Sequence, residues 1–241
     1  MRIDPDVCIA CEACIPYCPV EAISVDDAKG LEVIDQDKCV DCGVCLNSKV
    51  CPVDCIVFEP QPYPRSLRVT FSNPRTGHKA TGIAGRGTEE MKTNDVTGRF
   101  KRGWIGLGLE FGRPGVSSNF RDLEKMSMAL AKHGVLFEEK NPVTFLMKDT
   151  KTGKLKDEVL DERVLSGIIE CLFPIEKLEA VLATMKEVSK QIDTVFSVDC
   201  ICKADPDGSY PVKKILAKVG ITPYINGKQN VGLGRPLAKE E

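Results

Sequence analysis

The sequence predicts an α+β protein made of two modules of unequal size, and three observations support this fold class. Cysteine is concentrated near the N-terminus, because nine of the twelve cysteines lie between Cys8 and Cys55. Charge divides in the same way, since residues 1–60 carry a net side-chain charge of −8 and the remainder carries +6. Beyond residue 66, segments typical of strands and helices alternate, which favours an α/β sandwich with helices on one face of a mixed sheet.

These features also place the module boundaries. We expect a cysteine-rich module at residues 1–60, a linker at 61–66 and an α+β domain of unknown role at 67–241. The linker lies within "EPQPYPRSL", which holds three prolines and therefore favours an extended chain.

The composition argues against several classes of protein. Of the 241 residues, 42% are hydrophobic and 28% are charged, as in an ordinary globular protein. No apolar run approaches the roughly 18–20 residues of a membrane span, so we expect no direct membrane insertion. No apolar stretch precedes the first cysteine at position 8, which predicts a cytoplasmic protein without a secretory signal. The low aromatic share of 6% and the net charge of −2 argue against nucleic-acid binding.

Two cysteine runs repeat one pattern about thirty residues apart. They are Cys8-x2-Cys11-x2-Cys14-x3-Cys18-Pro19 and Cys39-x2-Cys42-x2-Cys45-x5-Cys51-Pro52. In a reducing compartment this spacing favours metal ligands over disulfides. Three thiolates at i, i+3 and i+6 can hold three corners of a cubic cluster if the backbone curls tightly, and the fourth must come from elsewhere. Zinc stays an alternative, because C-x2-C pairs also bind it, but zinc would leave the third cysteine without a role.

On these motifs, residues 1–60 resemble the bacterial two-cluster ferredoxins, in which the Cys-Pro cysteine ligates the other cluster. The resemblance implies two [4Fe–4S] clusters as cofactors. It implies one cluster on Cys8, Cys11, Cys14 and Cys51, and a second on Cys39, Cys42, Cys45 and Cys18. The segments 20–27 and 54–60, one after each Cys-Pro, fit the short strands of that family.

Two departures from the family pattern leave alternatives open. The second run has five residues, not three, before its last cysteine, which could reshape the surroundings of one cluster. Cys55 is a ninth cysteine, and its counterpart in the first repeat is Ala22. Cys55 is either a free thiol packed near a cluster or an alternative ligand, and in the latter case the second site could hold a three-iron cluster.

The larger module is expected to contain at least eight elements. Strands are predicted at 65–71, 103–112, within 143–155 and at 193–202, and a hairpin at 222–234. Helices are predicted at 118–134, 161–173, 174–192 and 210–220. Ser118 or Asn119 would cap the first helix, and Gly134 would end it. From residue 103 the order resembles the βαββαβ ferredoxin-like plait of ACT-type ligand-sensing domains, which is an analogy of fold and not of function.

A candidate anion or ligand site lies in two glycine-rich stretches. The segment 82–103 holds five glycines and five basic residues, and its amides could receive an anion beside Arg86 and Gly87. The segment 106–119 leads into a helix, which suits a phosphate or carboxylate near Arg113 and Ser117. The alternatives are a solvated or docking loop for the first stretch and tight packing with a turn for the second.

Three further cysteines, Cys171, Cys200 and Cys202, lie in the larger module. Cys200 and Cys202 share one face of a predicted strand, because side chains alternate along a strand. Together with Cys171 they could bind a metal or a third cluster. The alternative is that Cys200 and Cys202 are ordinary buried thiols on a core-facing strand.

The sequence therefore predicts an electron-transfer protein or subunit, which relays single low-potential electrons through two clusters to or from a partner redox enzyme or larger complex. The alternative is a reductase in its own right, with flavin or a heteroaromatic or acyl substrate in the C-terminal domain. Residues 85–120 are similar to proteins described as 6-hydroxynicotinate reductases, which favours that alternative. A third hypothesis is a regulator in which a ligand-sensing plait responds to the clusters. No catalytic residue is identified.

Overall fold

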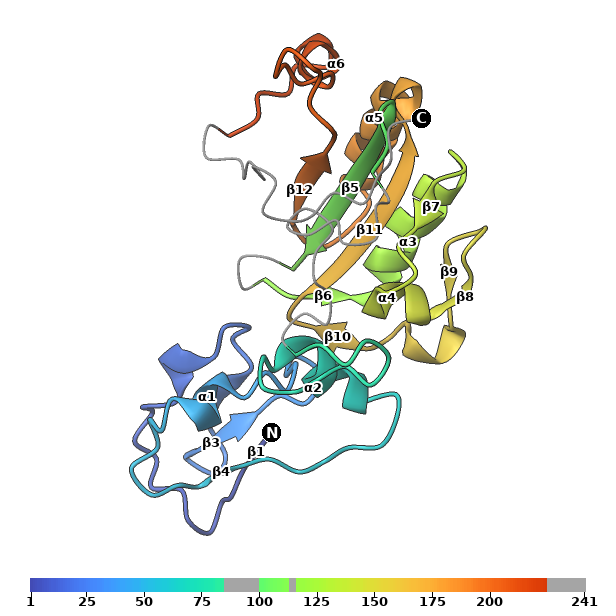
Figure 1. Ribbon diagram of the computed structural model, residues 1–241. Helices are drawn as coiled ribbons and strands as arrows, with labels where there is room; N and C mark the ends of the chain where they lie inside the picture. The colour runs from blue at the N-terminus through green and yellow to red at the C-terminus, as the bar shows by residue number, and fades with distance from the viewer. Residues whose placement is uncertain (85–99, 113–115, 225–241) are drawn as a thin grey trace.

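The protein contains two separate hydrophobic cores, a smaller one near the N-terminus and a larger one in the remainder of the chain. A computed structural model describes residues 1–84, 100–112 and 116–224 (Figure 1). The smaller core is formed by residues between Met1 and Ile56, and the larger by residues between Phe71 and Leu216. In Figure 1 the N-terminal module lies below the larger module, and the helix α2 (Ser66–Ser72) lies between them.

The N-terminal module is a pair of similar halves built from short elements. Its strands are β1 (Arg2–Ile3), β2 (Ile23–Asp26), β3 (Leu31–Ile34) and β4 (Ile56–Val57). The first pairs with the last and the two middle strands form a hairpin, all antiparallel. A 3-10 turn, η1 (Ile15–Tyr17), and a short helix, α1 (Val44–Asn47), complete the module. The strands β2 and β4 confirm those predicted within 20–27 and 54–60.

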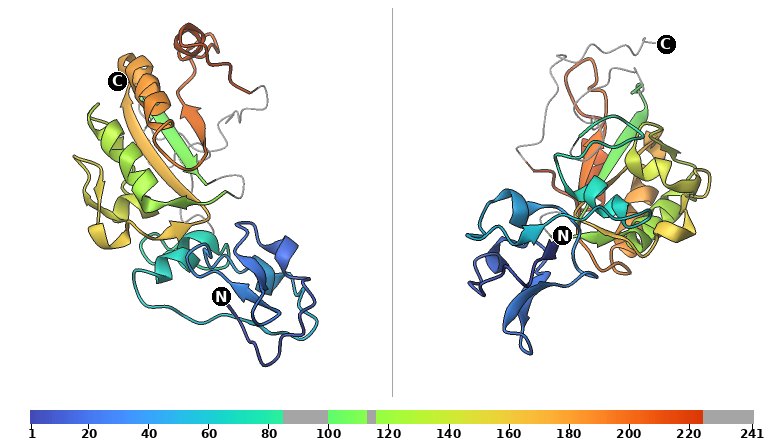
Figure 2. Two further views of the ribbon diagram at one scale, coloured as in Figure 1. Left: turned by 180° about the vertical axis from the view of Figure 1, so that it is seen from behind. Right: turned by 90° about the horizontal axis from the view of Figure 1, so that it is seen from below.

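The larger module is organised around a four-stranded antiparallel sheet. Its strands are β5 (Trp104–Phe111), β7 (Leu136–Phe137), β11 (Gly167–Pro174) and β12 (Phe196–Ile201). They lie side by side in the order β12-β5-β11-β7. The two long helices, α3 (Phe120–Ala131) and α5 (Leu178–Val188), contact each other and lie on one face of this sheet (Figures 1 and 2).

Alternation along the central strand determines which side chains meet the helices. Ile105, Leu107, Leu109 and Phe111 of β5 are fully buried in the large core, together with Phe120, Leu123, Met126 and Leu130 of α3. Gly106, Gly108 and Glu110 point to the opposite face, because successive strand residues alternate. Full burial of each large apolar side chain contributes about 1.5–3 kcal/mol, so this layer holds the module together.

Smaller elements surround the sheet. The strand β6 (Ser118–Asn119) pairs with β10 (Arg163–Val164), and β8 (Met147–Asp149) pairs with β9 (Lys154–Leu155). The remaining short helices are α4 (Pro142–Phe145), η2 (Asp157–Val159), η3 (Ile175–Lys177) and α6 (Lys213–Lys218). Within the residues that the structure describes, no helix is long and apolar enough to cross a membrane.

Several predicted elements are confirmed. The helix expected at 118–134 is α3, and the Asn119 side chain accepts a hydrogen bond from the amide of Asp122 as an N-cap. The helix expected from Pro174 is η3 followed by α5, and the helix that ends before Gly220 is α6. The strands at 103–112 and 193–202 are β5 and β12. Of the segment 143–155, the second half forms β8, a turn and β9, as predicted, whereas 142–145 is the helix α4.

Three predictions for the larger module are wrong. The segment 65–71 is the helix α2 and not a strand, because Leu67 and Phe71, one helical turn apart, both pack on the large core. The segment 161–173 forms β10 and β11 and not a helix: β11 lies between β5 and β7 in the sheet and has apolar residues on both faces, so it lacks the alternation that marks a strand. The main sheet is antiparallel throughout and not mixed. Most of the hairpin expected at 222–234 lies outside the described residues.

Candidate metal centres

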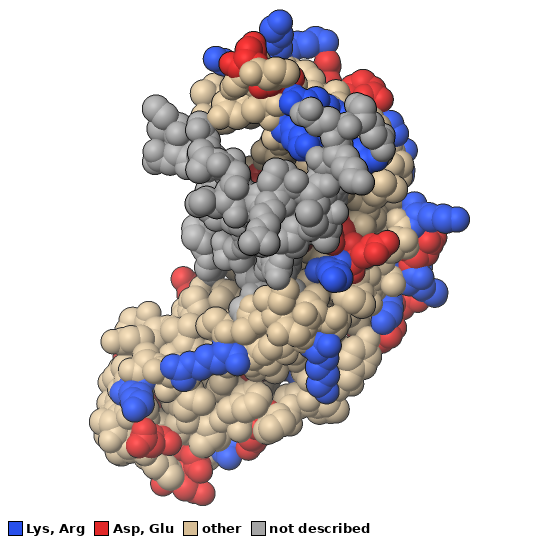
Figure 3. All heavy atoms as spheres, in the orientation of Figure 1, with Lys and Arg blue, Asp and Glu red and all other residues tan. Residues whose placement is uncertain are grey.

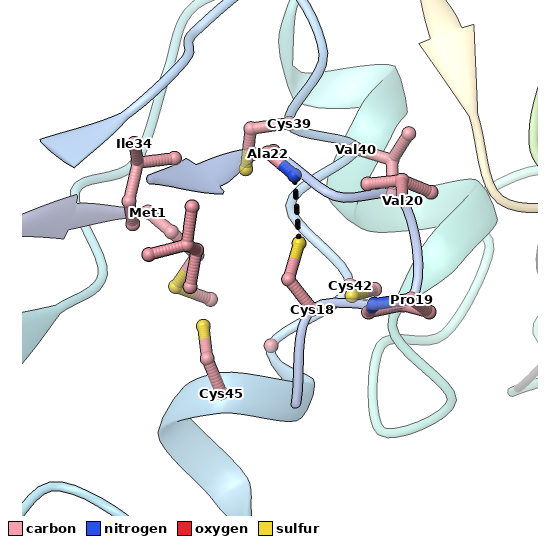
Figure 4. Close-up of a pocket in the computed structure, with 12 residues that line it drawn as sticks. Met1, Cys18, Pro19, Val20, Ala22, Ile34, Cys39, Val40, Cys42 and Cys45 are labelled. Atoms are coloured by element: carbon pink, nitrogen blue, oxygen red, sulfur yellow. Dashed lines mark hydrogen bonds between the residues drawn. The ribbon is translucent and has the colours of Figure 1, made fainter. Parts of the chain in front are cut away.

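Four thiols from both cysteine runs line a single cavity in the N-terminal module. Cys39, Cys42 and Cys45 come from the second run and Cys18 from the end of the first, and Figure 4 shows them around a common space. The cavity opens to solvent, and the empty space of about 300 Å³ between the lining residues includes part of that open solvent. Its other walls are mainly apolar and include Met1, Pro19, Val20, Ala22, Ile23, Ile34 and Val40. The fold therefore brings Cys18 across the module to the three thiols of the other run.

The other four thiols of the two runs gather at the opposite half of the module; they are called the first set, and the four thiols that line the cavity are called the second set. Cys8, Cys11 and Cys14 come from the first run, and Cys51 comes from the end of the second. Burial, and then Glu32, Cys11 and Cys8, raise the pKa of Cys14 to about 11. Cys51 lies beside Cys55 with their sulfur atoms 3.4 Å apart, and Cys8 also raises the pKa of Cys55. The two sets thus exchange their Cys-Pro cysteines.

Left-handed backbone conformations produce the tight curl of each loop. Ala10 and Glu12 in the first run both have a φ of 56°. Asp41 and Gly43 occupy the equivalent positions of the second run with φ values of 53° and 72°. Non-glycine residues rarely adopt this conformation. Its repetition at matching positions therefore indicates that both cysteine loops are built to curl around a bound group.

Backbone amides support the two thiols that cross over. The Ala22 amide donates to the Cys18 sulfur at 3.1 Å, and the Cys55 amide donates to the Cys51 sulfur at 3.3 Å. Burial raises the pKa of Cys51, but the amides of Cys55 and Val53 lower it below its ordinary value overall. Amides that point at sulfur stabilise a thiolate, which is the form that binds metal.

Burial keeps the remaining thiols of the second set protonated until a metal is bound. Burial, and then the sulfur atoms of Cys42, Cys39 and Cys18, raise the pKa of Cys45 to about 12. Metal binding must therefore displace protons from this site. All eight donors are sulfur, and the cavity walls are apolar, so the residues present fit iron–sulfur clusters.

Glu32 on β3 (Leu31–Ile34), which lies next to the first set of thiols, was missed in the sequence. Its side chain is buried, and it accepts hydrogen bonds from the Cys8 thiol at 2.8 Å and from the Glu12 amide. The bond from Cys8 lowers the pKa of Glu32. A charged residue in the apolar strand "LEVI" was the available signal.

Two arginines, Arg65 just before α2 and Arg68 within it, connect the second set of thiols to the larger module. Arg68 is buried and donates from one terminal nitrogen to the carbonyls of Gln36, Asp37 and Cys39 at 2.9, 3.1 and 2.8 Å. Its Nε atom pairs with Glu162 at 2.5 Å. Arg65 pairs with Asp41, which also pairs with the Met1 amine. These contacts were missed because residues 65–71 were assigned to a strand.

The candidate anion site is described only in part. Arg86, Gly87 and Arg113 lie outside the described residues. Ser117 is buried in the left-handed region, with a φ of 71°. Its hydroxyl accepts from Arg163 at 3.0 Å and its carbonyl accepts from the Thr194 hydroxyl at 2.6 Å. Ser117 therefore joins β10 and the segment before β12 to the β5–β6 connection.

The three cysteines of the larger module lie in different environments. Cys171 is fully buried, Cys202 is half-buried and Cys200 is exposed, so the expectation of two buried thiols is wrong for Cys200. Cys171 and Cys200 pair with Leu107 from opposite sides. Among the described residues, no three side chains of His, Cys, Asp or Glu converge closely enough to hold a single metal ion.

Comparison with known proteins agrees with the geometry of the N-terminal module. Residues 1–58 match the family model of the 4Fe-4S dicluster domain. Ferredoxin-2 of Chlorobaculum tepidum is 48% identical over 58 residues, which cover 22% of this chain and 87% of that protein. Pyruvate synthase subunit PorD of Methanocaldococcus jannaschii is 41% identical over 54 residues, which cover 22% of this chain and 59% of that protein.

A third relative matches a smaller part of a longer protein. The polyferredoxin-like subunit of the aliphatic sulfonate oxidoreductase of Pyrococcus furiosus is 39% identical over 44 residues, which cover 17% of this chain and 25% of that protein. The chain thus spans less than two thirds of the two oxidoreductase subunits, and its similarity to them concerns the cysteine module. On the match to residues 1–58 and the identity to ferredoxin-2, the chain belongs to the [4Fe–4S] dicluster ferredoxins.

Proposed function

We propose that this protein relays single low-potential electrons through two [4Fe–4S] clusters to or from a partner redox enzyme. The observation that carries the proposal is the exchange of Cys18 and Cys51 between the two thiol sets. One metal ion per run would not require this exchange, whereas two adjacent cubic clusters do. The four thiols of the second set also surround a cavity, which favours a cluster over zinc there.

The ligand assignment follows the two thiol sets. Cys8, Cys11, Cys14 and Cys51 would hold the first cluster, and Cys39, Cys42, Cys45 and Cys18 the second. When bound, each cluster supplies a one-electron redox couple. The chain supplies thiolates, the supporting amides of Ala22 and Cys55, and apolar walls that restrict water around the second site.

The partner is proposed to be a larger oxidoreductase or one of its subunits. Two of the relatives are named as subunits of such enzymes, and in each the match is to the cysteine module. Residues 1–60 carry a net charge of −8, and Asp and Glu side chains are visible at the far end of this module in Figure 3. Such a surface favours a partner with basic residues around its electron-acceptor site.

The larger module has a fold that fits a docking or ligand-sensing role. Its elements β5-α3-β7-β11-α5-β12 follow a βαββαβ order, which supports the proposed likeness to ferredoxin-like plaits. Element order alone does not give a function. The reductase alternative, with flavin or an organic substrate, depends on Arg86, Gly87 and Arg113, which lie outside the described residues.

The test is to purify the full chain without oxygen and measure iron, sulfide, zinc and flavin together with the EPR spectrum of the reduced protein. We expect about eight iron atoms per chain, two interacting clusters and no flavin. Zinc in place of iron would refute the proposal, and bound flavin would favour the reductase.

Ligand variants test the assignment of the two sets. Cys14→Ser or Cys51→Ser should destroy or convert the first cluster and spare the second, and Cys45→Ser should do the opposite. Cys171→Ser is the matched control, because this thiol is buried in the other module. Loss of both clusters from each ligand variant, with none from the control, would contradict two separate sites.

A further inference from the structure

The two halves of the N-terminal module have the same backbone at the crossing thiols but a different side chain. Ala22 follows Cys18 by four residues, and Cys55 follows Cys51 by four. Each donates its amide to that sulfur. The residues before them, Glu21 and Asp54, have φ values of 52° and 53°. The backbone around the two sulfurs is thus repeated, and one position carries a methyl group where the other carries a thiol.

The Cys55 thiol is placed against the Cys51 sulfur. Its sulfur lies 3.4 Å from that of Cys51, which is within hydrogen-bonding distance for two sulfur atoms, and the residue is 5% exposed. Ala22, in contrast, is 1% exposed and its methyl group forms part of the wall of the second cavity. Among the described residues, the second cavity is lined by its four donor cysteines and by no further thiol.

The direction of the sulfur–sulfur hydrogen bond follows from the proposed role of Cys51. A cysteine that ligates iron is a thiolate and can only accept a hydrogen bond. In the 3.4 Å contact between the two sulfur atoms, only the S–H of Cys55 is then left to donate. Cys55 is therefore the donor.

We propose that Cys55 is not a ligand but a positioning residue that donates its S–H to Cys51, and that it raises the reduction potential of the first cluster. This inference rests on the proposed function. The donated bond stabilises negative charge on the Cys51 sulfur, and that charge increases when the cluster is reduced. At the second set the corresponding residue, Ala22, offers the Cys18 sulfur an amide but no S–H, so the hydrogen bond favours the first cluster as the place where the electron resides.

The test compares three variants of the full chain by EPR-monitored redox titration, with iron counted in each. Cys55→Ala removes the donor, Cys55→Ser replaces the S–H with an O–H, and Ala22→Cys introduces the thiol at the other cluster. The spectrum of Cys45→Ser, which retains the first cluster, identifies its signal. We expect Cys55→Ala to keep about eight iron atoms and to lower the reduced-to-oxidised ratio of the first cluster about fivefold at fixed potential.

That ratio corresponds to about 40 mV for a one-electron couple, and the second cluster should not move. Cys55→Ser should retain most of the wild-type potential, and Ala22→Cys should raise that of the second cluster. An S–H stretching band in the infrared spectrum, shifted by hydrogen bonding and absent in Cys55→Ala, provides a readout that a packing role would not give.

Two results would overturn the proposal. One is loss of about four iron atoms from Cys55→Ala, which would make Cys55 a ligand. The other is an unchanged potential of the first cluster in Cys55→Ala at full iron content. A wild-type protein without two clusters would instead refute the proposed function. If Ala22→Cys does not assemble its cluster, the comparison of Cys55→Ala with Cys55→Ser still decides.

Discussion

Arg68 connects the two modules, and its removal should uncouple them. The guanidinium group comes from α2, pairs with Glu162 of the larger module, and caps three carbonyls of the loop that leads into Cys39. The side chain is 7% exposed and that of Glu162 is 13% exposed, so water can replace little of what is lost. The substitution Arg68→Ala leaves a buried carboxylate and three carbonyls without their donor.

The loss of unfolding free energy expected for Arg68→Ala is large compared with the loss from breaking an ordinary surface ion pair. Breaking a buried ion pair by removing one partner costs about 3–5 kcal/mol, because the remaining charge stays desolvated. The same guanidinium group makes the three hydrogen bonds to carbonyls, so the free energy of losing them is not added to that of the ion pair. If the unfolding free energy falls by about 2 kcal/mol per molar of urea, the apparent urea midpoint of Arg68→Ala should lie roughly 1.5–2.5 M below that of the wild type.

The two modules can be followed separately in one anaerobic urea series. Trp104 on β5 is the only tryptophan of the chain, so its fluorescence reports the larger module. Visible absorbance of the clusters reports the N-terminal module. We expect the two transitions to coincide in the wild type and to separate in Arg68→Ala, with all samples read after one fixed incubation because cluster loss is irreversible.

The control is Arg121→Ala, which removes a pair with Asp161 whose side chains are 55% and 80% exposed. Exposed pairs contribute about 0–1 kcal/mol, so this variant should shift little. The double variant Arg68→Ala with Glu162→Gln should regain part of the loss, since no unpaired charge remains. A shift for Arg68→Ala no larger than that for Arg121→Ala would refute the reasoning.

Three further variants, at His78, Gly112 and Gly208, test the larger module. His78 is buried against Phe71, its Nε2 atom has no hydrogen-bond partner among the described residues, and burial lowers its pKa to about 4 from 6.5. Below pH 6.5 the unfolded state takes up a proton that the native state does not, so the unfolding free energy should fall by about 2 kcal/mol between pH 7 and pH 5. His78→Leu should remove that slope in Trp104 fluorescence, and an unchanged slope would exclude His78 as its source. Gly112 and Gly208 are both left-handed, but a Cβ at Gly112 would lie 2.3 Å from the Leu165 carbonyl oxygen, whereas nothing lies within 4 Å at Gly208. Gly208→Ala should therefore cost about 1–2 kcal/mol, and Gly112→Ala distinctly more, by thermal unfolding; equal costs would contradict the close approach.

The N-terminal module was accessible from sequence because its information is local. Cysteine spacing indicates which thiols share a loop, and each Cys-Pro is followed by a short strand that the structure confirms. The contribution of Glu32 was not accessible in this way. It reaches the first thiol set from β3, more than twenty residues along the chain, and only the folded hairpin brings it to Cys8 and Glu12.

The larger module was less predictable because its patterns fit two periods. In "RSLRVTF" the apolar residues Leu67, Val69 and Phe71 alternate as in a strand, but Leu67 and Phe71 are also one helical turn apart. Tertiary packing decides between them, since the helix brings Phe71 to the core and Arg68 to the cysteine module. In β11, the run around Ile168 and Ile169 is apolar on both faces, so it carries no strand alternation.

The contacts made by Arg68, Arg65 and Cys55 give the two proposed clusters different surroundings. The loop of the second set is fixed to the larger module through Arg68 at the Cys39 carbonyl and Arg65 at Asp41. The first set has Cys11 exposed to solvent and Cys55 placed against Cys51. Two sites with equal surroundings would not differ in which one faces a partner. These differences make the first site accessible to a partner and join the second site to the larger module. Arg68→Ala acts on the second site and Cys55→Ala on the first. The effects of two such distant substitutions on the free energy of unfolding should add, so a double variant would measure how independent the two sites are.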